Sequence, residues 1–271
     1  MKSLLALLLV CSAIEAAEFK ENKANPGELR VVPMDPTPEP VHVRTIVYFP
    51  RDYSMETDQP VNFQVKIEGY PLQIESDFER RKDLQNDPKG QALRVIVDNL
   101  PPFSMHQSVV DNLDDSENYY DLTLNQDLPF HFKPGQHIIR IFPIRTFGEA
   151  LKDPGSYSAT VFYYKSKDPT QDVDLDKPYM TYNEPQGSYK YREGKPILLD
   201  FLLAHCQLSK DGYKVRLTID GKDTRVLTQW VPYYIYGLKT GEHRIRLELL
   251  NPRNVKVPGA FNDVEKKFTI K

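Results

Sequence analysis

Two stretches of the chain decide its architecture: Gly135–Ile141 (GQHIIRI) and Gly241–Leu247 (GEHRIRL). Each begins with a glycine, carries a histidine two positions later and continues with apolar residues at every second position. Alternation with a period of two is typical of a β-strand with one buried face. Because the two stretches lie about a hundred residues apart, the repeating unit has the size of a whole domain, not of a solenoid repeat.

Further landmarks repeat around these two strands in the same order. The matched pairs are Tyr48–Pro50 with Asn183–Pro185, Pro60–Phe63 with Pro196–Leu199, Leu93–Asn99 with Val215–Gly221, and Pro154–Tyr157 with Pro258–Phe261. The sequence therefore predicts two domains of the same fold.

Both halves consist of short alternating segments, about seven in each, separated by turns such as Asp98-Asn99 and Asp220-Gly221. Short strands with regularly spaced turn signals are typical of a β-sandwich. The one helical candidate, Phe78–Gln85, lacks an apolar stripe. The prediction is an all-β chain.

The order of these landmarks resembles that of bacterial extracytoplasmic immunoglobulin-like domains. A strand opened by Pro60 or Pro196 is followed by a strand ending in Asp-Asn or Asp-Gly, and then by the Gly-x-His strand. The Asp-x-x-Gly-Asn turn of the commonest version is missing, so no subfamily is assigned. The resemblance implies two tandem immunoglobulin-like β-sandwiches joined by a short acidic linker. It implies no particular function, because this fold serves adhesion, scaffolding, sugar binding and spacing.

The N-terminus has the pattern of a secretory signal peptide over residues 1–17, with a basic start at Lys2 and a short apolar run. Lipid attachment at Cys11 is the alternative. Residues 18–40 carry five prolines and are predicted to form a tether, within which Leu29–Val32 can also pair as an edge strand. The expected domains are residues 41–165 and 172–271, joined by a linker at 166–171.

Composition and motifs exclude several functions. The net charge is −3, whereas a nucleic-acid-binding protein normally shows a basic face. No catalytic or cofactor-binding motif is present, and no apolar run long enough to span a membrane follows the signal peptide. Without Cys11, Cys206 is the only cysteine, so no internal disulfide is expected and its thiol is predicted to be buried. We expect neither an enzyme nor a cofactor.

The first half contains two insertions that are predicted to be long surface loops. Ser76–Lys89 carries charges of both signs, and Pro101–Asp121 carries acidic residues but no lysine or arginine. Long loops on a rigid sandwich are common places for function. Asp114 and Asp115 are therefore candidates for a partner surface.

The densest aromatic segment, Gln229–Tyr236, is a second candidate surface. Alternation along a strand places Ile235 on the inward face and Tyr234 and Tyr236 on the outward face, where aromatic rings can stack on sugars or anchor a protein. For the tyrosines, core packing and a ligand surface both stay open. For Trp230, core packing is favoured over a ligand surface.

Other polar residues are assigned structural roles. His137 and His243 lack metal-ligand or catalytic partners nearby and are predicted to fix the entry of their strands by bonding a neighbouring loop. The spaced carboxylates of Asp172–Asp176 suit either calcium or an acidic edge strand with Val173 and Leu175 inward, and we favour the edge strand. No metal site is expected.

These observations favour an exported, non-catalytic binding or structural module of a bacterial cell envelope, in the periplasm or on the cell surface. The expected partner is an envelope protein or glycan. The alternative is a carbohydrate-binding accessory protein that uses the aromatic strip of the second domain, Trp230, Tyr234 and Tyr236.

Overall fold

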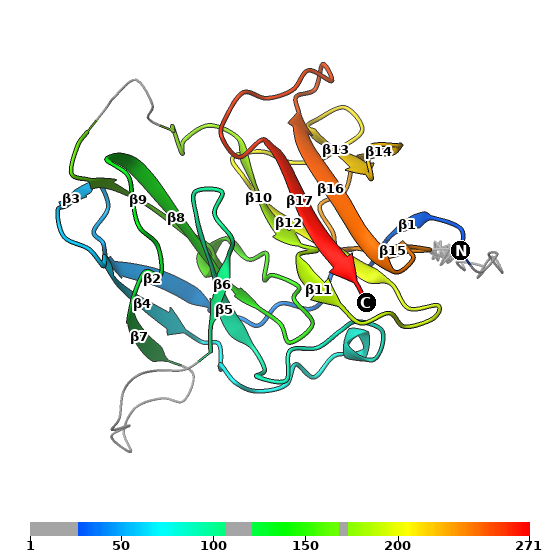
Figure 1. Ribbon diagram of the computed structural model, residues 1–271, viewed down its shortest axis with the longest axis horizontal. Coiled ribbons are helices and arrows are strands. Elements are labelled where there is room, and N and C mark those ends of the chain that lie inside the picture. The colour runs from blue at the N-terminus through cyan, green and yellow to red at the C-terminus, as the bar shows by residue number, and fades with distance from the viewer. Residues whose placement is uncertain (1–26, 107–120, 168–172) are drawn as a thin grey trace, which may run out of the picture.

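The structure is a computed structural model that describes residues 27–106, 121–167 and 173–271. These residues form seventeen strands and two short 3-10 helices, η1 (Glu79–Lys82) and η2 (Pro154–Ser156). Figure 1 shows how the strands are arranged. In the described ranges no helix has the length and apolar character needed to cross a membrane. The candidates Asp114 and Asp115 lie outside the described residues.

The first half of the chain forms two sheets that face each other. The three-stranded sheet has the order β2 (Arg44–Phe49), β4 (Asn62–Glu68), β7 (Leu122–Asp127). The five-stranded sheet has the order β3 (Ser54–Glu56), β9 (Ser158–Tyr164), β8 (Gly135–Ile144), β5 (Ala92–Val97), β6 (Phe103–Met105). We call these two sheets the first sandwich.

The second half repeats this arrangement strand for strand and forms the second sandwich. One sheet has the order β1 (Arg30–Pro33), β15 (Tyr233–Tyr236), β12 (Ile197–Ala204), β10 (Tyr179–Glu184). The other has the order β11 (Gly187–Tyr189), β17 (Asp263–Ile270), β16 (Gly241–Leu250), β13 (Lys214–Ile219), β14 (Asp223–Leu227). Apart from β1, each strand matches one in the first sandwich, which confirms the predicted all-β sandwich fold.

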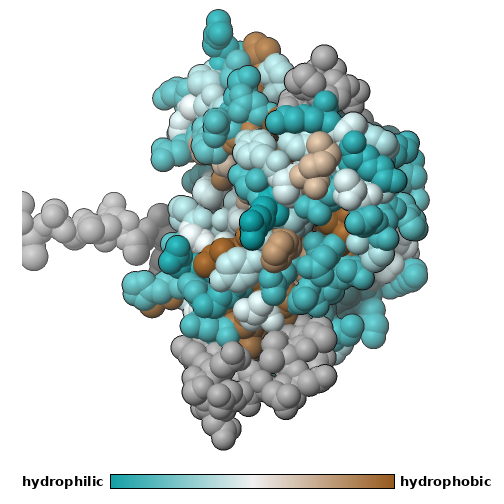
Figure 2. Space-filling model, turned by 90° about the vertical axis from the view of Figure 1, so that its left-hand side faces the viewer, coloured by the Kyte–Doolittle hydropathy of each residue, from teal (hydrophilic) through white to brown (hydrophobic). Residues whose placement is uncertain are grey.

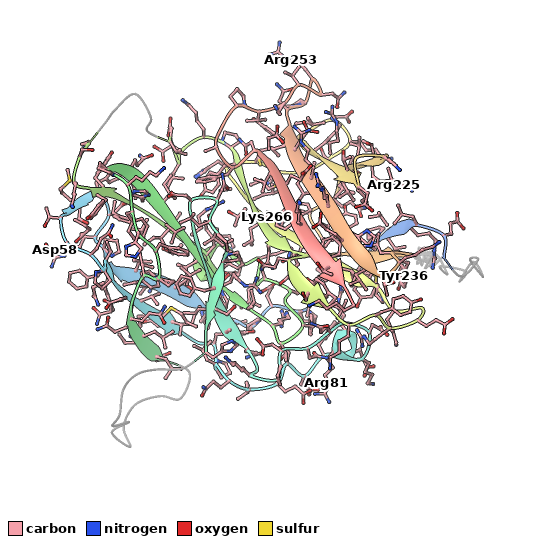
Figure 3. The ribbon with its side chains drawn as sticks, viewed as in Figure 1. Asp58, Arg81, Arg225, Tyr236, Arg253 and Lys266 are labelled. Carbon is pink, nitrogen blue, oxygen red and sulfur yellow. The ribbon has the colours of Figure 1, made fainter. Side chains whose placement is uncertain are left out.

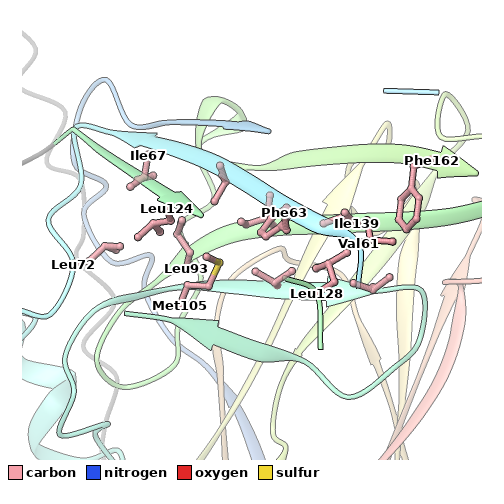
Figure 4. Close-up of a cluster of buried hydrophobic side chains, with 14 of the residues drawn as sticks. Val61, Phe63, Ile67, Leu72, Leu93, Met105, Leu124, Leu128, Ile139 and Phe162 are labelled. Carbon is pink, nitrogen blue, oxygen red and sulfur yellow. The ribbon is translucent and has the colours of Figure 1, made fainter. Parts of the chain in front are cut away.

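Alternation along the strands builds a separate core in each sandwich. In the first, Phe63 and Val65 of β4 are fully buried against Leu93 and Val95 of β5 (Figure 4). Burying an apolar side chain of this size contributes about 1.5–3 kcal/mol relative to leaving it exposed. The second core is built in the same way from β12, β13 and β16.

A hydrogen-bonded pair of an aspartate and a histidine, which we call the Asp–His clasp, closes the first sandwich at one end of β8. Asp98 follows β5 with φ +51°, and its Oδ1 accepts the Ile138 backbone N–H at 2.9 Å. Its Oδ2 lies 2.7 Å from His137 Nδ1, and His137 Nε2 lies 2.8 Å from the Lys133 carbonyl oxygen. Since oxygen acceptors face both ring nitrogens, both nitrogens donate when the imidazole is protonated.

The second sandwich contains the same clasp. Asp220, also at φ +51°, accepts the Arg244 N–H at 2.8 Å and lies 2.8 Å from His243 Nδ1. His243 Nε2 is 2.8 Å from the Lys239 carbonyl oxygen. The histidines thus contact a neighbouring loop as predicted. Their aspartate partners were not predicted from the sequence.

Part of the predicted tether belongs to the second sandwich. β1 pairs antiparallel with β15, with Val31 opposite Ile235, and Leu29 and Val31 pack against the second core. The free backbone edge of β15 and the apolar side chains of this segment explain the pairing. The edge strand that the sequence allowed at Leu29–Val32 is therefore present at Arg30–Pro33, while the predicted domain boundaries stay predictions.

The acidic segment before β10 differs from the predicted edge strand. Residues 173–178 are irregular, and Asp172 lies outside the described residues. Val173 and Leu175 are nevertheless half-buried and pack against the apolar cluster of β8, β9 and β10, whereas Asp174 is exposed and pairs with Lys177 at 3.1 Å. The Val173 N–H donates to the side-chain Oε1 of Gln136 on β8 and not to a backbone carbonyl oxygen of that strand. Calcium independence stays a prediction.

The first clasp makes stability depend on pH. Burial alone lowers the pKa of His137, but the hydrogen bonds to Asp98 and Lys133 leave that pKa above its ordinary value of 6.5. Stabilisation by the charged ring is therefore complete below pH 6.5 and is lost as the pH rises through the raised pKa. We expect His137→Gln to lower the free energy of unfolding by about 1–2 kcal/mol at pH 5.5 and by less at pH 8.5. Urea titrations of both proteins test this, and a pH-independent difference would contradict it.

Candidate binding groove between the two sandwiches

The insertion Ser76–Lys89 packs between the sandwiches, which corrects its assignment as a surface loop. Leu84 is buried against Phe147 of the first sandwich and against Leu198 and Tyr234 of the second. Phe147 on the first sandwich and Leu198 and Tyr234 on the second can be buried only if the insertion covers them. Charge alone was therefore a misleading guide to the exposure of this segment.

Arg80 of η1 connects the insertion to the N-terminal segment. Its guanidinium donates to the carbonyl oxygen of Asp35, and its Nε lies 3.7 Å from Glu149 Oε2. The same Glu149 oxygen accepts the Thr37 hydroxyl at 2.8 Å, and Thr37 and Glu149 are both buried. Residues 34–40 therefore form a strap that leads from β1 on the second sandwich to β2 on the first.

Apolar side chains form the centre of the contact. Ile96 and Phe142, on the outer face of the five-stranded sheet of the first sandwich, belong to one cluster with Leu202 and Trp230 of the second. The Trp230 indole N–H donates to the Phe201 carbonyl oxygen at 2.9 Å. Trp230 also packs against the second core, so it bridges core and interface instead of lying on a ligand surface.

Buried charges cross the same contact. Arg94 of β5 lies 2.9 Å from Glu184 of β10, and both residues are less than a tenth exposed. Burial raises the pKa of Glu184, although the Arg94 guanidinium opposes this effect. Beside them Asp200, fully buried, accepts the Ala150 N–H at 3.0 Å and the Asn183 side-chain amide at 2.7 Å.

The contact between the sandwiches covers the tyrosines that were predicted to form a partner surface. Alternation was predicted correctly, since Tyr233 and Ile235 face the second core and Tyr234 faces away from it. Tyr234 is only 1% exposed, however, because Leu84 and its neighbours cover it. Tyr236, labelled in Figure 3, is half-buried under the Arg30 guanidinium, 4.8 Å from the ring centroid. A ligand surface is therefore wrong for Tyr234, whereas for Tyr236, which is only half-buried, it stays a prediction.

A groove of about 610 Å³ opens beside this contact and has walls from both sandwiches. Phe103 and Ser104 of β6 lie on one wall, Ser188 and Tyr189 of β11 on the other, and Arg94 and Glu184 line it between them. β6 and β11 are each the outermost strand of their sheet. No sequence pattern predicted this groove, because its walls come from segments about eighty residues apart.

The walls combine apolar surface with hydrogen-bond donors. Phe103 and Leu238 supply apolar surface, and Lys190 and Arg192 supply positive charge. The Tyr189 hydroxyl bonds to Glu184 Oε2, while the Gln186 side-chain nitrogen is buried without a hydrogen-bond partner in the described structure. Apolar walls with a few convergent polar groups are typical of ligand sites. The Lys190 ammonium and the Gln186 amide suit a ligand rich in oxygen acceptors.

The described residues contain no group of three or more His, Cys, Asp or Glu arranged to hold a metal. Cys206 is unpaired and half-buried, and burial raises the pKa of its thiol to about 11. A thiol with this pKa is almost fully protonated at neutral pH, which makes it a poor nucleophile.

No protein-family model and no curated protein matches this chain. Among solved structures, it is similar to the fibronectin(III)-like modules of Clostridium thermocellum CbhA, with 11% identity and a TM-score of 0.27, covering 84% of this chain and 94% of that one. Another is the tandem V-type regions of VCBP3, a v-region-containing chitin binding protein, with 9% identity and a TM-score of 0.24, covering 84% and 99%. The fold assignment rests on the strand order of the four sheets.

The Arg94–Glu184 pair should behave as a coupled unit. Arg94→Met leaves the Glu184 carboxylate buried without its partner, which typically costs about 3–5 kcal/mol. We expect the double variant Arg94→Met/Glu184→Leu to recover part of this loss, because no unpaired charge remains. Urea unfolding of the wild type, both single variants and the double variant measures the coupling. Additive losses would contradict a buried, coupled pair.

Proposed function

We propose that the protein is an exported, non-catalytic binding module of a bacterial cell envelope whose ligand binds in the groove between the two sandwiches. The observation that carries the proposal is the groove itself, which has walls from both sandwiches and the buried Arg94–Glu184 pair between them. Export is supported by the signal-peptide pattern of residues 1–17.

A preformed groove favours binding over a pure spacer role. Ligand sites commonly measure about 300–1,000 Å³, and the groove falls within this range. A spacer needs no cavity and no buried charges between its domains. Because packed side chains and ion pairs fix both walls, a ligand would meet a site that is already formed and would cost little ordering entropy.

A free sheet edge indicates how a protein ligand would bind. An extended peptide can add to the backbone edge of β6, while its carbonyl oxygens and acidic side chains meet the donors of the groove. The outer edge of β11 is capped, because the Gln85 side chain bonds to the Ser188 carbonyl oxygen and to the Lys190 N–H. A glycan is the second candidate ligand, because Tyr191 lines the groove and is half exposed, so its ring can stack on a sugar. This glycan site differs from the one expected at the aromatic strip of the second domain, which loses its support because Tyr234 is buried.

Capture from envelope extract tests the proposal. The mature protein, immobilised, is compared with Ser188→Trp, whose indole would fill the groove, and with Val226→Ser, which alters an exposed apolar residue of β14 outside it. We expect one ligand to be retained by the wild type and by Val226→Ser, and to be reduced at least tenfold by Ser188→Trp. Prior digestion of the extract with proteinase K separates a peptide ligand from a glycan. Equal capture by all three proteins would contradict the proposal.

A further inference from the structure

The first sandwich exposes four large apolar side chains within eight residues. Tyr48, Phe49, Tyr53 and Met55 are 41%, 43%, 61% and 48% exposed. We call residues 48–55 the β2–β3 corner, because they lead from the end of β2 into β3. The register of β2 against β4 shifts between Val47 and Phe49, so the neighbouring residues Tyr48 and Phe49 are both exposed.

The corresponding corner of the second sandwich is a docking surface. The register of β10 against β12 shifts in the same way between Tyr182 and Glu184. Asn183 and Glu184 therefore occupy the positions of Tyr48 and Phe49. The Asn183 amide donates to the Gly148 carbonyl oxygen at 2.7 Å, and Glu184 pairs with Arg94, so both contact the first sandwich. This chain thus already uses the corner to join one sandwich to another.

In the first sandwich the same corner faces away from the second. Figure 2 looks onto this end of the molecule, where brown and tan areas lie within the teal surface. Clustered exposed apolar side chains commonly mark an interaction site, whereas single ones need no explanation. Tyr48 and Phe49 occupy the positions that Asn183 and Glu184 use for docking in the second sandwich. These aromatic residues therefore indicate a second contact, made with another molecule.

A head-to-tail chain of copies does not fit this corner. In the first sandwich, the face that receives the corner of the second sandwich carries Phe142 on β8 opposite Arg94 on β5. The equivalent residues of the second sandwich are Glu248 on β16 opposite Arg216 on β13. Glu248 lies 3.3 Å from Arg216 and 3.7 Å from Arg246. An apolar corner docked there would desolvate these ion pairs without offering them any new polar partner, which is unfavourable.

We propose that two copies of the chain associate through their β2–β3 corners about a twofold axis. A twofold contact places the same patch against itself, so the charges around it must be of both signs. Arg51 and Lys165 supply positive charge, and Asp52 and Glu56 supply negative charge. The Lys165 N–H donates to the Glu56 carbonyl oxygen, which places Lys165 beside β3.

The size of the corner predicts a reversible dimer. Stable interfaces bury about 800 Å² on each partner, so four partly exposed side chains can form only the apolar centre of such a contact. The dimer should therefore dissociate on dilution. This contact lies outside the groove and does not depend on the proposed ligand.

Sedimentation velocity of the mature protein from about 1 to 200 µM tests the proposal. We expect the weight-average mass to approach that of a dimer at high concentration. Phe49→Ser should weaken dimerisation at least tenfold, because it removes an aromatic ring from the centre of the contact. The matched control is Val226→Ser on β14, which changes another exposed apolar residue and should dimerise like the wild type.

Thermal unfolding checks that each variant is folded, and Met55→Lys replaces Phe49→Ser if the latter is not. Three results would overturn the proposal: a monomer at every concentration, a dimer unaffected by the folded corner variant, or a growing series of polymers. The groove variant Ser188→Trp should leave dimerisation unchanged, so this result is independent of ligand capture.

Discussion

The buried ion pair between Arg94 and Glu184 is the constraint on which the rest of the molecule depends. Both charges are removed from water and pair with each other across the two sandwiches, while Glu184 also accepts hydrogen bonds from the Tyr189 hydroxyl and the Gln186 N–H of its own sandwich. The pair therefore penalises every arrangement of the sandwiches except the one in which the two residues meet. Asp200 and Asn183 reinforce this geometry from the same side of the second sandwich. One consequence is a groove whose two walls are held at a fixed separation.

The N-terminal strap and the insertion complete the contact. Thr37, Glu149 and Arg80 form a buried polar chain that includes the strap, the first sandwich and η1. β1 continues the strap onto the edge of β15, so a segment that precedes the first sandwich becomes part of the second. Two sandwiches joined only by a linker would move independently, whereas the strap, the insertion and the Arg94–Glu184 pair all join these two.

The sequence predicted features that depend on residues near one another in the chain. Alternation located the strands, and the repeated Gly-x-His motif marked equivalent positions, with Gly135 and Gly241 each opening a strand at φ +135° and +137°. Alternation also predicted correctly that Tyr234 faces away from the second core. Alternation cannot show what covers the outer face, and here that cover is Leu84, about 150 positions earlier. The groove escaped prediction for the same reason.

The central claim is that the two sandwiches form one rigid unit. It is tested most directly by the distance between spin labels at Asp58→Cys, near the free end of the first sandwich, and Arg225→Cys on β14 of the second, in a Cys206→Ser background (Figure 3). Pulsed electron–electron double resonance on dilute mature protein should give one narrow distance distribution. A broad distribution, or several distances, would show that the sandwiches move independently and would contradict the account.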